Sequence, residues 1–223
     1  MSSVNLNRQK KINDQMKEVM DDFDRFEYFF ASHWKHIVMA AVAVVVVVAV
    51  IVTAKYVINK NKLEAAQAFG KATDIAQFEA AFAQYSSAPA TAYLQLAKLY
   101  SDKKEFAKAR KQLVTAAGLT DTPEVQWRAR LNLAYLDEME GKFADGAKAF
   151  ADIAKTLRAP GSAGYAAEAY YGAGRLYMLA KQNNEARTIL DAGRNYIKGL
   201  SAEDRQSAAD FAGMINSALA ACK

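Results

Sequence analysis

Residues 37–54 read IVMAAVAVVVVVAVIVTA, an unbroken run of apolar residues that contains one threonine. Extended to residue 58, the segment has about 20 residues, and a helix of that length spans a hydrocarbon core of roughly 30 Å. Valine is a poor helix former in water, but in lipid the backbone groups can satisfy only one another. Trp34 and Tyr56 stand at the two edges, where amphipathic aromatic side chains prefer to lie. The sequence therefore predicts one transmembrane helix over residues 35–58.

Two other structures could contain such an apolar run. A buried strand or core helix rarely stays free of charge over this length. A cleaved signal peptide has a short basic region before it and small residues at its end, whereas here the preceding region is long and partly acidic and no cleavage motif follows. We therefore expect the segment to remain in the protein as a membrane anchor.

The charge distribution bears on partners and on orientation. The formal net charge is +5, but residues 63–223 hold twenty Lys/Arg against eighteen Asp/Glu, so we expect no nucleic-acid partner. Residues 1–36 hold six Lys/Arg, whereas the basic residues that follow the span are Lys55, Lys60, Lys62 and Lys71. Only Arg25 and Lys35 lie close upstream, so the positive-inside signal is nearly balanced.

Residues 1–34 predict an amphipathic helix with an apolar stripe. Steps of four and three residues place its members on one face: Ile12, Met16, Val19, Phe23, Phe26 and Phe30. The opposite face is acidic, whereas a helix that lies on anionic lipid would need Lys and Arg there. We expect the stripe to dock on a membrane protein complex or on a second copy of the chain; the alternative is loose packing at the membrane surface.

The rest of the chain predicts helices only. Residues 59–88 favour two membrane-proximal helices, one continuing the transmembrane helix and one packing back on it. The three prolines, Pro89, Pro123 and Pro160, are 34 and 37 residues apart, and a period of 34 is typical of a helix–turn–helix repeat. Residues 89–223 therefore predict about three repeats, and Ser201, followed by Asp204, predicts the start of a last helix that caps them.

Each repeat shows a recurring order of large, small and aromatic residues. The first carries Tyr93, Leu96, Ala97 and Tyr100, then Phe106, Ala109, Leu113 and Ala116. The third carries Tyr170, Ala173, Gly174 and Tyr177, then Ala186, Leu190 and Gly193. The second departs at Asp137, where an aromatic residue is expected, and at Gly146, where alanine is usual. The pattern resembles the tetratricopeptide-repeat family, which implies a solenoid of helical hairpins.

The resemblance also implies a binding surface, because the first helices of such hairpins line a concave groove. Its positions in this chain are Leu94, Lys98, Asp102, Arg128, Leu131, Tyr135, Glu138, Tyr171, Arg175 and Met178. Aromatic and aliphatic anchors mixed with both charges suit an extended peptide or a partner helix. Leu94 and Lys98 replace the Lys and Asn of a carboxylate clamp, so a clamp for a C-terminus is not expected.

Catalytic and metal sites are not expected. The only histidines, His33 and His36, lie at the membrane edge, and residues 63–223 contain none. That composition excludes Ser-His-Asp, Cys-His and His-metal designs from the repeat region. The only cysteine, Cys222, cannot form a disulfide within the chain. We expect neither cofactor nor metal; an enzyme with an unrecognised carboxylate site is a remote alternative.

The order of segments resembles a second group of proteins. A short N-terminal segment containing R25-F-E-Y-F-F, one span and then repeats resembles the bacterial ancillary subunits of the Sec translocon. This resemblance implies a single-pass inner-membrane protein, with a cytoplasmic N-terminus and a periplasmic repeat domain, that contacts emerging polypeptides and chaperones. A scaffold for another envelope assembly and a cytosol-facing receptor for targeting signals are the alternatives.

Overall fold

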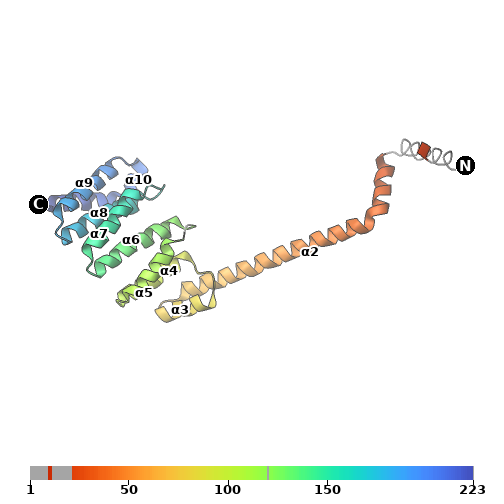
Figure 1. Cartoon of the computed structure of the whole chain (residues 1–223), viewed down its shortest axis with the longest axis horizontal. Coiled ribbons are helices and arrows are strands. Elements are labelled where there is room, and N and C mark those ends of the chain that lie inside the picture. Colours follow the sequence, from red (N-terminus) through yellow and green to blue (C-terminus); the bar gives the residue numbers. More distant parts are fainter. Residues whose placement is uncertain (1–9, 12–21, 120, 223) are drawn as a thin grey trace. The chain divides into compact units, whose positions relative to one another are not determined.

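The computed structural model describes residues 10–11, 22–119 and 121–222, and in these ranges the chain is helical and has no strand. The all-α prediction is therefore confirmed. The chain divides into two compact units, one ending at Asn61 and the other beginning at Lys62. Figure 1 shows the helices of each unit.

The helix α2, Asp22–Lys71, is 50 residues long; it begins in the N-terminal unit, and its last residues belong to the second unit. None of the residues in its apolar segment is buried, and α2 is long and apolar enough to cross a membrane. The helix has no break at residues 34–35 or 58–59, where the sequence analysis placed boundaries. Apolar and amphipathic segments are one continuous helix here because no proline or glycine interrupts residues 22–69.

The last turns of α2 pack against α3, Ile75–Gln84. Asp74 caps α3, since its carboxylate accepts a hydrogen bond from the Gln77 amide at 2.9 Å. The Phe69 ring lies 4.8 Å from that of Phe82 and 6.3 Å from that of Phe78. The short helix therefore packs against the end of the long one.

Three helical hairpins follow, α4–α5, α6–α7 and α8–α9, and consecutive helices contact one another (Figure 1). Two helices complete the chain, and α11 packs against both α8 and α9. The bounds are α4 Ala90–Asp102, α5 Phe106–Ala117, α6 Pro123–Met139, α7 Phe143–Thr156, α8 Ala163–Leu179, α9 Asn183–Lys198, α10 Ala202–Ser207 and α11 Ala209–Ala221.

The turns inside the three hairpins have the same structure. Lys104, Gly141 and Lys181 each have a positive φ, of 61°, 76° and 60°. The next amide in each turn donates a 2.8 Å hydrogen bond to the carbonyl five residues earlier, which belongs to Tyr100, Asp137 and Tyr177 respectively. This is the backbone arrangement that commonly ends a helix with one left-handed residue. The hairpins can therefore be aligned residue by residue.

The aligned turns are 37 and then 40 residues apart. The proline spacing is therefore not the structural period. Pro89 and Pro123 stand at the starts of α4 and α6, but Pro160 lies in the loop two residues before the cap of α8. The extra residues lie in the helices and in the loops that join the hairpins.

Both departures in the second hairpin have a structural explanation. Asp137 occupies the position of Tyr100 and Tyr177, and its carboxylate binds the Arg110 guanidinium of α5 at 2.7 Å. A Cβ atom on Gly146 would lie 2.9 Å from Leu176 Cδ1 and 3.0 Å from the Ala134 carbonyl. The charge links two hairpins, and the glycine lets α7 approach α6 and α8 closely.

The predicted last helix is two helices rather than one. Ser201 accepts a hydrogen bond from the Asp204 amide at 3.1 Å, as a cap does. However, the helix breaks at Ala208, with φ −101° and ψ 1°. The break lets Ala208 and Ile215 be buried in the same core beside α8.

The hairpins bury two apolar clusters that meet on α6. One extends from α6 to α11 and includes Leu131, Phe150 and Leu190. The other joins the end of α2 to α3, α4, α5 and Leu136 of α6. Because α6 contributes side chains to both clusters, it is held in place on the side of the predicted groove that faces α4.

Candidate functional site

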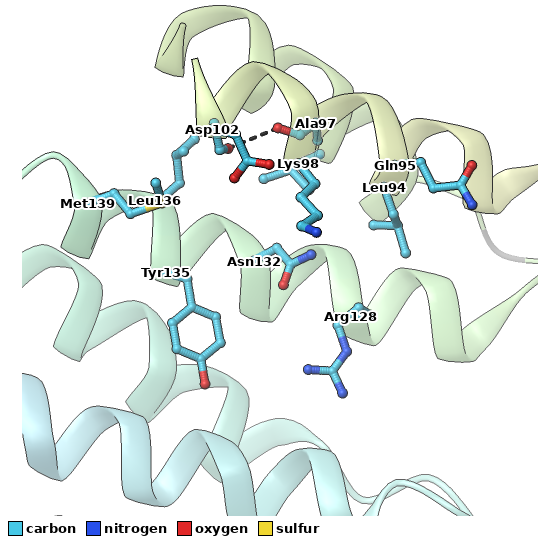
Figure 2. A pocket seen from close by; sticks show the side chains of 12 residues that line it. Leu94, Gln95, Ala97, Lys98, Asp102, Arg128, Asn132, Tyr135, Leu136 and Met139 are labelled. Carbon is cyan, nitrogen blue, oxygen red and sulfur yellow. Dashed lines mark hydrogen bonds between the residues drawn. The ribbon is translucent and has the colours of Figure 1, made fainter. Parts of the chain in front are cut away.

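A cavity of ≈ 410 Å³ opens between α4 and α6. Figure 2 shows Leu94 and Lys98 reaching from α4 toward Asn132 of α6. Its lining is Leu94, Gln95, Ala97, Lys98, Ser101, Asp102, Leu113, Arg128, Asn132, Tyr135, Leu136 and Met139. An apolar floor with a few convergent polar groups is typical of a ligand-binding cavity.

The spacing of residues along α6 explains how this wall forms. Arg128, Asn132, Tyr135 and Met139 follow one another at steps of four, three and four, which places them on one helix face. Leu94, Lys98 and Ser101 repeat the first two steps on α4, and Ser101 is fixed by a 2.9 Å hydrogen bond to the Ala97 carbonyl. Each wall is thus a single helical stripe.

Arg128 and Tyr135 also face the next hairpin. The Arg128 guanidinium binds both carboxylate oxygens of Glu168 on α8, at 2.9 and 3.0 Å, and the Tyr135 hydroxyl donates to Glu168 Oε1 at 3.0 Å. Figure 2 shows both side chains directed away from α4. Burial, followed by the nearby Glu168 carboxylate, raises the pKa of Tyr135, so its hydroxyl stays a donor.

Between α6 and α8, which are the first helices of the second and third hairpins, ion pairs and ring contacts occupy the surface. Arg175 of α8 binds both carboxylate oxygens of Glu138 on α6, at 2.5 and 2.6 Å. The Tyr171 ring lies 6.4 Å from that of Phe211 on α11, and Met178 is partly buried. The α6–α8 surface is therefore bridged by paired charges, and the cavity beside Arg128 and Glu168, of ≈ 240 Å³, is smaller than the cavity between α4 and α6.

The structure brings together five of the ten predicted groove residues around the cavity: Leu94, Lys98, Asp102, Arg128 and Tyr135. Glu138, Tyr171, Arg175 and Met178 lie on the α6–α8 surface instead. The placement of Leu131 in the groove is wrong, because its side chain is 0% exposed and belongs to the core. Leu131 lies on the same helix face as Trp127 and Ala134, which are buried too.

The groove prediction also missed residues. Asn132 and Met139 lie one turn beyond Arg128 and Tyr135, so the stripe through those two predicted residues would have found them. Leu113 and Leu136 are buried residues that form the floor. Nothing in the sequence pattern of one helix alone indicates such a floor.

The predicted N-terminal stripe is described only in part. Ile12, Met16 and Val19 lie outside the described residues, and Phe23 falls within α2. The rings of Phe26 and Phe30 lie 4.8 Å apart and are exposed, 63% and 43%. In the described part of the stripe, two aromatic side chains thus share one exposed face of α2.

The histidines and the cysteine lie apart from the cavity. His33 Nδ1 is 2.6 Å from Ser32 Oγ and 3.1 Å from the Phe29 carbonyl, and its ring stacks on that of Phe29. Cys222 is buried, and its thiol donates to the Asn183 carbonyl at 3.5 Å. Among the residues that the structure describes, no three potential metal ligands gather in one place.

Comparisons with protein-family models, with curated proteins and with solved structures found no match to this chain. The class that the structure itself defines is an all-helical protein with one long apolar N-terminal helix, able by length and composition to cross a membrane.

Proposed function

We propose that this chain is a membrane-anchored scaffold whose tetratricopeptide-like domain binds an extended segment of another polypeptide. The observation that carries the proposal is the open cavity between α4 and α6, with its apolar floor and polar walls. The neighbouring α6–α8 surface is bridged by ion pairs and has a smaller cavity, of ≈ 240 Å³, so the cavity between α4 and α6 offers more room for a ligand.

The lining favours a peptide over a small charged ligand. Leu136 and Leu113 form an apolar floor that suits one inserted side chain, and Gln95 and Asn132 offer amides to a peptide backbone. Lys98 and Asp102 bring one charge of each sign from the same helix. Anchors with mixed polar flanks are typical of sites for an extended chain.

We further propose that the chain is an ancillary subunit of the protein-translocation machinery in the bacterial inner membrane. The support is the order of segments, with an aromatic stripe, one span and hairpins, together with the resemblance of that order to translocon subunits. A scaffold for another envelope assembly would use the same groove. The two roles differ in the membrane complex that the aromatic stripe contacts.

In-cell photo-cross-linking tests the groove. A photoreactive phenylalanine analogue at Met139, on the cavity wall and 52% exposed, should capture a secretory polypeptide arrested during export. The same analogue at Val114, which is 58% exposed on α5 outside the cavity lining, is the matched control and should not. Equal capture at both positions would contradict the proposal.

A second pair of labels tests the membrane assignment. Because Cys222 is buried, sidedness should be measured with a Val114→Cys variant and an impermeant thiol reagent. Labelling from the periplasmic side, with Sec subunits captured from Phe26, supports the translocon role. Labelling only after the inner membrane is opened would overturn it in favour of a cytosol-facing receptor for targeting signals.

A further inference from the structure

The first hairpin has a charge that the others lack. Over residues 90–117, the α4–α5 hairpin holds six Lys/Arg and two Asp/Glu. The α6–α7 hairpin, residues 123–156, holds five and six, and the α8–α9 hairpin, residues 163–198, holds five and three. The excess of positive charge in the hairpin region is therefore concentrated in the hairpin nearest in sequence to the apolar helix.

The aligned turns show that the fold does not require this charge. The first hairpin places lysine at four positions around its turn and along the outer side of α5: Lys103, Lys104, Lys108 and Lys111. The same positions hold Glu140, Gly141, Asp145 and Lys148 in the second hairpin, and Ala180, Lys181, Glu185 and Thr188 in the third. The net charge at these four positions is thus +4 in the first hairpin, −1 in the second and 0 in the third.

These four lysines, which we call the basic face, are all exposed. Lys108 pairs with Glu105 at 2.7 Å and lies over the Tyr100 ring. Within the described ranges, Lys103, Lys104 and Lys111 have no ion pair. Positive charge that internal carboxylates do not neutralise attracts an anionic partner.

The chain between the apolar segment and the first hairpin is short. From residue 58, α2 continues to Lys71, and thirteen residues of helix extend about 20 Å. The buried side chains of Ala65 and Phe69 belong to the same core as α4 and α5. Clusters of four or more basic residues are typical of sites for anionic lipid headgroups.

We propose that the basic face binds the phosphate groups of anionic phospholipids in the membrane that α2 spans. The inference rests on α2 as a membrane anchor and does not depend on the peptide groove. Because the attraction is electrostatic, it weakens as salt shortens the Debye length. An acidic polypeptide is the other partner that such a face could attract, and the experiment separates the two.

The full chain should be placed in nanodiscs of zwitterionic phosphatidylcholine, with or without phosphatidylglycerol, and its lysines acetylated briefly. Lys103, Lys104 and Lys111 should react about fivefold more slowly in the anionic discs, and 0.5 M salt should abolish the difference, at a Debye length of about 4 Å. Lys148, Lys155 and Lys181 are exposed lysines of the other hairpins and serve as controls within the same molecule. Their rates should stay equal in both discs.

Equal rates at the basic face in both kinds of disc, or slowing of all six lysines together, would overturn the proposal. Protection by added polyglutamate in the zwitterionic discs, without protection by anionic lipid, would overturn it in favour of an acidic polypeptide.

A dye on Val114→Cys gives a second measurement, energy transfer to labelled lipid. The energy transfer should no longer depend on phosphatidylglycerol in a triple variant of the basic face, Lys103→Gln with Lys104→Gln and Lys111→Gln. The dependence should remain in the control triple variant, Lys148→Gln with Lys155→Gln and Lys181→Gln. Loss of the dependence in both triple variants would also count against the basic face.

Discussion

Gly174 allows α8 and α9 to pack as closely as they do. A Cβ atom at this position would lie 2.4 Å from both Cγ and Cδ2 of Leu190. The aligned positions in the other hairpins are Ala97 and Ala134, which are buried at 2% and 0% exposure. The third hairpin thus has glycine where the others have one methyl group, and in this hairpin the Leu190 side chain occupies the space that the methyl group would need.

Gly174→Ala should lower the free energy of unfolding by about 1–3 kcal/mol, since overpacking forces Leu190 or the α8–α9 contact to move. Urea unfolding followed by circular dichroism measures it. Gly213→Ala is the matched control, because nothing lies within 4 Å of its Cβ position and alanine should stabilise α11 by about 0.5–1 kcal/mol. Similar losses in both variants would refute the packing argument.

Glu168 links two hairpins through Arg128 and Tyr135 and is only 7% exposed. Glu168→Ala should cost about 1–3 kcal/mol, as it leaves the hydroxyl of the partly buried Tyr135 and one side of Arg128 without a partner. The exposed pair Asp191–Arg194 is the control, and Asp191→Ala should cost less than about 1 kcal/mol. Equal unfolding midpoints for the two variants would contradict this.

Among the predicted groove residues, those that a single helical stripe identifies lie at the cavity. Leu94 and Lys98 follow from the helical period and the resemblance, and both line the cavity. The prediction that Leu131 lines the groove was wrong because a surface position and a core position can be only one residue apart on a helix, which is about 100° of rotation. The ion pair of Arg175 with Glu138 joins separate helices, so no pattern within a single helix could indicate it.

At the scale of the element, α3 is tied to α4 by one short hydrogen bond. The Tyr100 hydroxyl donates to Glu79 Oε1 at 2.5 Å. Burial of the ring, then the hydrogen bond and charge of Glu79, raises the pKa of Tyr100 from 10.0 to about 12. This hydrogen bond between α3 and α4 therefore depends on a neutral tyrosine, whereas the ring contact between Phe82 and Tyr93 does not.

This predicts a loss of stability in alkali. A phenol with a raised folded-state pKa contributes stability fully below the unfolded value of 10.0, and that contribution is lost as the pH rises to about 12. The difference in unfolding free energy between the natural protein and Tyr100→Phe should therefore narrow from pH 9 to pH 11, measured by urea titration. A constant difference across that range would show that Glu79 does not control the Tyr100 phenol.

The elements themselves were largely predictable, and their junctions were not. Helices and turns follow from apolar periodicity and from the residues around Gly141. The proline spacing misled because Pro160 stands in a longer loop before α8. The break at Ala208 could not be predicted from the sequence, because it depends on how α10 packs against α8 and α11 against both α8 and α9, which are tertiary contacts.

At the scale of the whole molecule, the two apolar clusters predict that the hairpins do not unfold as one unit. The cluster at the α2 end includes Phe78, which is 2% exposed, and shares only α6 with the other cluster. In stacked hairpins, stability is a sum of units and nearest-neighbour contacts. Phe78→Ala should cost about 3–5 kcal/mol, mainly in α3, α4 and α5.

Hydrogen exchange by mass spectrometry measures where that loss falls. Amide exchange should accelerate in α3, α4 and α5, while α8, α9 and α11 keep their protection, because their core contains no side chain of the first cluster. Phe26→Ala removes an exposed phenylalanine from α2 and should leave both regions unchanged. Uniform acceleration through α11 would mean that α6 transmits unfolding from one cluster to the other, and that the hairpins form one cooperative unit.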